Sequence, residues 1–263
     1  MVRETTPEVF LIARPAIDLE GMGRYLAAVG GSGWLERRLA EGGGEVNHGE
    51  LLVEFAGRAC YRSWEPGLNP NVTRVRADRT AYFRNILKSA HGSVLEHSNY
   101  SFALHNVSRV ATHEIVRHRA GAVFSQESLR YVRLVDIGFR VPAALEPLRQ
   151  QCLQLVEQLE EFQLSAAKAL DLDADGIPFH VKKEVTSALR RLAPIGLSTD
   201  LVMTMNLRTL RHVVQMRTDP AAEEELRLIF GKIAEMMVKE TSGVFQDFRR
   251  SEDGSWVPEF VKV

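Results

Sequence analysis

Long apolar runs are missing from this sequence of 263 residues, and cysteine is nearly so. No stretch approaches the roughly 20 apolar residues of a membrane span, and the first residues lack the basic and apolar regions of a secretory signal. Cys60 and Cys152 stand far apart in no metal-binding or redox spacing, which favours a reducing compartment over a disulfide scaffold. We therefore expect a cytoplasmic protein without a membrane segment.

An excess of charge of either sign is also missing, because the formal net charge is -1 and the isoelectric point is near 6.7. A nearly neutral chain has no general basic field, which argues against nonspecific binding to nucleic acid or membrane surfaces. Any anion site must therefore be local. With 45% hydrophobic residues and no linker or repeat, the chain is expected to form one domain over residues 1–263.

Several familiar motifs are absent. The glycine clusters at 30–33 and 42–44 continue into neither a phosphate loop nor a Gly-x-Gly-x-x-Gly fingerprint, so we interpret both as loops, and any dinucleotide would bind without a Rossmann fold. No Gly-x-Ser-x-Gly elbow occurs. His113 and His118 are five residues apart, about 140° around a helix, and so do not form a metalloprotease zinc pair. No metal site is expected.

The hydrophobic pattern predicts an α+β protein. Strands are expected at 9–13, 98–105 and 134–141, and helices at 49–60, at 78–90, from Ser108 and from Asp219 as N-cap. One further helical stripe is expected to face the core: Leu148, Cys152, Leu155, Leu159 and Phe162. Cys60, at the end of an apolar helix, is also expected in the core, which disfavours a thiol nucleophile. Residues 251–263 are expected to form a partly ordered tail.

Arginine is concentrated locally, in Arg117-His118-Arg119 and the following residues to Arg133. Arg190-Arg191 and the segment from Asn206 to Arg217 add further guanidinium groups interleaved with Ser, Asn and His. The planar fork of arginine suits phosphate and the carbonyl edge of a base. Ser125 to Ser128 offer hydroxyls and successive backbone N–H groups at a possible helix start or nest. These residues predict a site for a phosphorylated, base-containing ligand.

These segments together resemble the flavin-dependent thymidylate synthases, the ThyX family. The residues that carry the resemblance fall in the family's order: His91 to His97, Arg117-His118-Arg119, Ser128, Arg130-Tyr131, Arg190 with Pro194, Asn206-x-Arg208, His212 and Arg217. They span most of the chain. The resemblance implies a non-Rossmann fold of helices around a central, mostly antiparallel sheet, and a homotetramer whose active sites use several subunits.

The resemblance also implies the chemistry, which is the C5 methylation of dUMP to dTMP. FAD would be the cofactor, 5,10-methylenetetrahydrofolate the carbon donor and NADPH the reductant. Reduced flavin carries the difficult step, so no covalent protein nucleophile is required. This agrees with the poor cysteine candidates, and Ser128 is better interpreted as a phosphate ligand than as a nucleophile.

Positions matching the family motif supply the expected site residues. Those implied for the flavin are Ser93, Arg117, His118, Arg119, Gln126, Asn206, Arg208 and His212. Those implied for the nucleotide are Glu114, Arg117, Gln126, Glu127, Ser128, Arg130, Arg190 and Arg217. Arg217 is the expected catalytic residue, because it matches the arginine that favours ionisation of the pyrimidine N3.

Two departures from the family pattern bear on the substrate. Eight residues instead of seven separate Arg119 from Ser128, so that Glu127 occupies the strict position, and Glu114 stands where the family often has Gln. The longer spacer motivates an alternative, a related C5-methylase of another uridine nucleotide such as UMP. A different class, a non-enzymatic module binding nucleotides or nucleic acid, would give a colourless protein with steeply salt-dependent affinity for polyanions.

Overall fold

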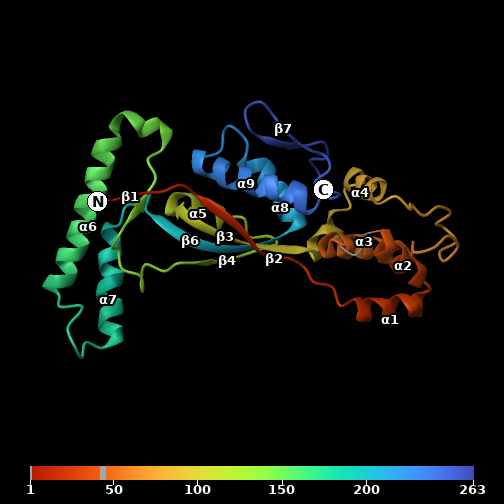
Figure 1. The fold of residues 1–263 in the computed structure, drawn as a ribbon, viewed down its shortest axis with the longest axis horizontal. Coiled ribbons are helices and arrows are strands. Elements are labelled where there is room, and N and C mark those ends of the chain that lie inside the picture. The colour runs from red at the N-terminus through yellow and green to blue at the C-terminus, as the bar shows by residue number, and fades with distance from the viewer. Residues whose placement is uncertain (1, 42–45) are drawn as a thin grey trace.

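A four-stranded sheet forms the centre of the computed structural model, which describes residues 2–41 and 46–263 (Figure 1). Its strands in spatial order are β2 (Glu8–Ala13), β3 (Asn99–Ser108), β6 (Ser198–Asn206) and β4 (Ala122–Gln126). All three pairings are antiparallel, which confirms the expected α+β fold with a central antiparallel sheet. Two small sheets accompany it: β1 (Arg3–Glu4) with β5 (Gly138–Phe139), and β7 (Phe248–Arg250) with β8 (Trp256–Pro258).

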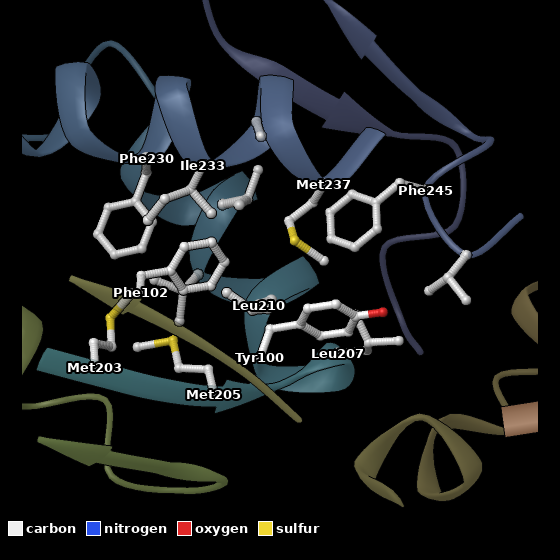
Figure 2. Close-up of a cluster of buried hydrophobic side chains, with 14 of the residues drawn as sticks. Tyr100, Phe102, Met203, Met205, Leu207, Leu210, Phe230, Ile233, Met237 and Phe245 are labelled. Atoms are coloured by element: carbon white, nitrogen blue, oxygen red, sulfur yellow. The ribbon is translucent and has the colours of Figure 1, made fainter. Parts of the chain in front are cut away.

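One face of the central sheet carries the main core. Successive side chains of a strand point to opposite faces, so Phe102 on β3 and Met203 on β6, which are cross-strand partners, point to the same side. Helices α8 (Leu207–Arg217) and α9 (Glu224–Glu240) cover that side, and Figure 2 shows Phe230 and Ile233 of α9 meeting these strand residues. The sequence spacing of Leu226, Ile229, Phe230, Ile233, Met236 and Met237 predicts one apolar face for this helix, and all six pack in the core, with Met236 partly buried.

The opposite face of the sheet is open. Phe10, Val202 and Val123 are 50%, 42% and 65% exposed, although each belongs to a strand. Phe10 and Val202 are both paired with Ala103, so they lie on one face, and Val123 pairs with Thr204 on that same face. The described chain therefore leaves an apolar sheet surface uncovered.

Four helices gather at one end of the molecule (Figure 1): α1 (Leu19–Val29), α2 (Ser32–Glu41), α3 (His48–Tyr61) and α4 (Arg79–Lys88). Gly30 ends α1 in the left-handed conformation and Ser32 begins α2, so Gly30 and Gly31 form the expected loop as a tight helix junction, while Ser32 and Gly33 belong to α2. The cluster at 42–44 lies outside the described residues. The core prediction for Cys60 is wrong: α3 buries Glu54 and Arg58, and Cys60, about 200° around from Arg58, is exposed.

The other end holds α6 (Arg149–Ala169) and α7 (Phe179–Leu189). The apolar stripe of α6 does not face the core, because Leu155 is 61% exposed and only Val156 and Gln163 of this helix are buried. The predicted strand at 134–141 is reduced to β5. The remaining short elements are η1 (Gly92–His97), α5 (Arg109–Ile115), η2 (Ala143–Leu148) and η3 (Arg190–Leu192).

The predicted start of α9 is also wrong. Asp219 closes a turn by accepting the backbone N–H of Ala221, and the helix begins at Glu224 with Glu223 as its N-cap. Ser125 and Gln126 end β4 and do not start a helix. In the described parts of the chain, no helix is both long and apolar enough to cross a membrane, and no three metal-ligating side chains cluster.

Candidate functional site

A pocket of about 770 Å³ lies beside the N-terminal half of α8. Two segments far apart in the sequence contribute most of its lining, residues 117–121 and residues within 206–215. Arg117, Arg119 and Arg208 are exposed in it, and Glu96 is the one acidic side chain among the described lining residues. The pocket is therefore strongly cationic in an otherwise neutral protein.

The start of α8 positions one side of this pocket. Asn206 is the N-cap, and its side-chain oxygen accepts the backbone N–H of Thr209 at 2.8 Å. Arg208 and His212 are four residues apart and so share one helix face, which lines the pocket. Arg208 donates from Nη1 to Glu96 Oε1 at 2.6 Å and from Nε to the Val263 carbonyl at 3.0 Å. This guanidinium is held in place before any ligand arrives.

The turn before β4 positions the other side. Gly121 has a φ of +67°, and its carbonyl accepts the Asn206 N–H at 3.0 Å, while Thr209 Oγ1 donates to the Ala120 carbonyl at 2.8 Å. A Cβ atom at residue 121 would lie 2.2 Å from Asn206 Nδ2. Only glycine satisfies both the backbone conformation and the close approach. The two arginine-bearing segments are thus joined directly.

Arg217, at the C-terminal end of α8, organises a second polar group. Its Nε donates to His118 Nε2 at 2.8 Å and its Nη1 donates to Glu114 Oε2 at 2.7 Å. The Arg217 side chain is 16% exposed, whereas that of Glu114 is 37% exposed. Glu114 comes from α5 and His118 from the segment that follows it, so the chain folds back to meet α8.

His118 is neutral at physiological pH. Desolvation by burial, followed by the positive charge of Arg217, lowers the pKa of His118 to about 4. Because Arg217 always donates, Nε2 must accept, and the imidazole proton stays on Nδ1. His118 therefore lies between the pocket and Arg217 as a fixed, uncharged acceptor.

The structure brings together only some of the residues predicted from the sequence. Arg117, His118, Arg119, Asn206, Arg208 and His212 share the pocket, and Glu114 and Arg217 adjoin it through His118. The others do not line it: Ser93, Gln126, Glu127, Ser128, Arg130 and Arg190. Ser93 is exposed on η1, near Glu96.

The remaining nucleotide candidates lie toward α6 and α7. Gln126 is paired with Leu201, five residues and about 17 Å along β6 from Asn206. Its amide donates to Thr112 Oγ1 at 3.0 Å, and Thr199 Oγ1 donates to Glu127 Oε2 at 3.2 Å. Ser128 Oγ accepts the Arg130 N–H at 3.3 Å.

Arg190 also does not line the cationic pocket. It lines a separate cavity of about 420 Å³ between the segment before β5 and the helices α6 and α7. Within the described single chain, the two groups of candidates therefore do not form one site.

Sequence reasoning missed several lining residues. Glu96 lies inside the family-motif segment from His91 to His97, so its position could have been inferred. Residues 258–263 gave no signal, because their pattern is that of an ordinary chain end. The prediction of a partly ordered tail is wrong: residues 248–258 form the β7–β8 hairpin, and Phe260 to Val263 line the pocket.

The fold and this site define an α+β protein with an arginine-rich, non-Rossmann pocket. A family model described as "Thymidylate synthase complementing protein" matches residues 45–241. A flavin-dependent thymidylate synthase of Mycobacterium marinum is 34% identical over 220 residues, which cover 81% of this chain and 86% of that protein. The enzyme of the same name from Corynebacterium diphtheriae is 33% identical over 213 residues, covering 78% and 82%.

A solved structure has the same fold. The UMP/dUMP methylase PolB from Streptomyces cacaoi, bound with 5-Br UMP, superposes with a TM-score of 0.59 and 18% identity over 92% of this chain and 94% of that one. This chain belongs to the flavin-dependent thymidylate synthase family, as its arginine and histidine motifs predicted.

Proposed function

We propose that this protein methylates dUMP at C5 to form dTMP, with FAD as cofactor, 5,10-methylenetetrahydrofolate as carbon donor and NADPH as reductant, and that residues 1–263 act as one domain. The observation that carries the proposal is the cationic pocket in which Arg117-His118-Arg119 meets Asn206, Arg208 and His212. The family membership gives that pocket its chemistry. The few cysteines support extending the proposal to a cytoplasmic location.

The pocket fits a dinucleotide with a pyrophosphate. The side chains of Arg117, Arg119 and His212 have no hydrogen-bond partner within the described chain, and Glu96 is the one acidic side chain among the described residues that line their pocket. Guanidinium groups without protein partners are suited to phosphate oxygens. We assign FAD to these residues, with Asn206 and Arg208 on the α8 side, and we keep Ser93 and Gln126, which do not line this pocket in one chain, as flavin candidates from the family motif.

Reduced flavin, when bound, would supply the hydride for the new methyl group. The residues around it position and polarise the nucleotide. We assign Arg217 to the pyrimidine N3, because His118 and Glu114 fix its guanidinium from Nε and Nη1 and leave Nη2 for a ligand. A positive charge held there stabilises negative charge that develops on the ring.

A second copy of the chain would complete the site. Ser128, Arg130 and Arg190, which we assign to the nucleotide phosphate and sugar with Glu127 beside them, lie away from the cationic pocket in one chain. Two apolar surfaces are left uncovered, the open sheet face around Val202 and the α6 stripe around Leu155. Exposed apolar surfaces of this kind mark interfaces. We infer a homotetramer whose sites combine the two groups from different subunits.

A second candidate substrate is UMP, because the spacer between Arg119 and Ser128 has one residue more than the family pattern. The additional residue does not loosen the turn, which is fixed on α8 by Gly121 and Thr209. Aligning Ser128 with the family motif places the additional residue within Ala120 to Phe124, between this turn and the middle of β4. The residues that would face the sugar are therefore the ones whose register differs from the pattern.

Purification under native conditions tests the proposal. We expect a yellow protein that releases FAD on denaturation and converts dUMP to dTMP with methylenetetrahydrofolate and NADPH. Arg217→Ala should abolish turnover while retaining flavin, whereas Arg208→Ala should lose flavin. A colourless protein that takes up no added FAD would contradict the flavoenzyme, and exclusive turnover of UMP would establish the alternative substrate.

A further inference from the structure

Residues 258–263 pack closely against the cationic pocket at Arg208. The Val263 carbonyl accepts Arg208 Nε at 3.0 Å, and a Cβ atom at residue 92 would lie 2.4 Å from the Val263 carbonyl carbon. Gly92 is therefore the residue that allows this chain segment to approach η1. Figure 1 marks this end of the chain next to α8 and α4.

A buried ion pair anchors this segment from behind. Arg211 on α8 donates to Asp247 Oδ1 at 2.7 Å and to Oδ2 at 2.9 Å, and the two side chains are 4% and 0% exposed. Asp247 Oδ2 also accepts the Phe260 N–H at 3.0 Å, and Arg211 Nη2 donates to the Phe260 carbonyl at 3.3 Å. A buried ion pair is stable only when its remaining donors and acceptors are satisfied. Here the segment satisfies them.

Helix α8 thus contributes to this part of the pocket in two ways. Arg208 and His212 point into the pocket, while Arg211 holds the segment that forms its wall. The exposed ammonium group of Lys262 lines the same pocket and has no partner within the described chain. A fourth cation is therefore added to Arg117, Arg119 and Arg208 by a part of the chain far from any motif.

We propose that residues 258–263 are a wall of the flavin pocket, in which the Val263 carbonyl positions Arg208 and Lys262 binds a phosphate of the dinucleotide. This inference rests on the proposed function. The pocket retains about 770 Å³ with the segment in place, and Arg208 keeps Nη2 for a ligand. The segment therefore frames the pocket and does not fill it.

Titration of the apoprotein with FAD, followed by flavin fluorescence, tests the wall. Lys262→Ala should raise the Kd for FAD about fivefold, and Lys262→Arg should restore it, because one charge-assisted contact is lost and regained. Removing residues 261–263 should raise Kd further, by about 20-fold, because Arg208 also loses its positioning carbonyl. The matched control is Lys239→Ala, an exposed lysine of α9 away from this pocket.

Each alternative result is informative. An unchanged Kd in Lys262→Ala and in the shortened chain would overturn the inference, and tighter binding in the shortened chain would show a plug instead of a wall. Thermal unfolding with and without FAD separates a folding defect from a loss of FAD binding. Lys262→Ala should leave the Tm of the apoprotein unchanged and lose only part of the increase in Tm that FAD gives. If the unaltered chain binds no FAD at all, it is the proposed function that fails.

Discussion

At the scale of single residues, two neighbours fix the position of the Arg217 guanidinium and shape the electric field around it. Glu114 pairs with it at 2.7 Å, while neutral His118 accepts from its other edge. A carboxylate partner reduces the field that a guanidinium exerts on a ligand. The guanidinium of Arg217, the proposed catalytic residue, is therefore fixed in position, and the Glu114 carboxylate offsets part of its positive charge.

Replacing Glu114 by Gln should raise kcat/KM for dUMP roughly two- to fivefold at neutral pH, because the amide oxygen still accepts from Arg217 while its opposing charge is removed. Steady-state kinetics measures this change. Glu235→Gln is the matched control, since Glu235 pairs with Arg250 on the exposed surface at 3.0 Å. A loss of activity as severe as that of Arg217→Ala would show that the negative charge itself is required.

At the scale of elements, the contact between the turn before β4 and the start of α8 joins the two halves of the pocket. Gly121 provides the backbone conformation, and Asn206 provides both the helix N-cap and the surface against which the glycine packs. The arginines on either side are placed by this one contact. A change here should therefore affect folding and flavin binding together.

Gly121→Ala should lower the free energy of unfolding by about 2 to 4 kcal/mol, of which about 1 is the left-handed conformation and the rest is the clash with Asn206. Gly176→Ala is the matched control, because Gly176 also has a positive φ, +81°, but nothing within 4 Å of a Cβ atom. Its cost should be about 1 kcal/mol. Urea denaturation compares the two, and equal losses would refute the packing role of Gly121.

At the scale of the whole molecule, the proposed assembly depends on the open sheet face. The strands that bury Phe102 and Met203 against α9 expose Phe10 and Val202 on the other side. Val202→Glu should therefore yield smaller assemblies in analytical ultracentrifugation and abolish dUMP turnover, because transferring a charge into an apolar interface is costly. Leu228→Glu, a change at an exposed leucine of α9, should leave the assembly intact.

Mixed subunits distinguish a shared site from a folding defect. Arg190→Ala and Arg208→Ala should each be inactive alone, and refolding them together should restore part of the activity, because some sites then receive both intact residues. No recovery on mixing, with assemblies of normal size, would contradict a site built from two chains.

The periodicity of the sequence was enough to predict the strands β2 and β3, the helix α3 and the apolar face of α9, because local side-chain patterns match these structures. The same periodicity wrongly predicted that the α6 stripe and Cys60 lie in the core. An apolar stripe indicates a surface suited to burial, but it does not indicate whether the same chain or another chain buries that surface. The start of α9 was missed because Asp219-Pro220 favours a turn as well as a helix N-terminus.

For the site, the sequence by itself determined the family and the identity of the arginines, because those residue types and their order carry the chemistry. Only the tertiary structure decided which of them meet. It joined residues 117–121 to α8 through Gly121, paired Arg217 with His118 and Glu114, and kept Arg190 apart. It also brought residues 258–263 to Arg208, a contact between segments more than fifty residues apart that no local pattern records.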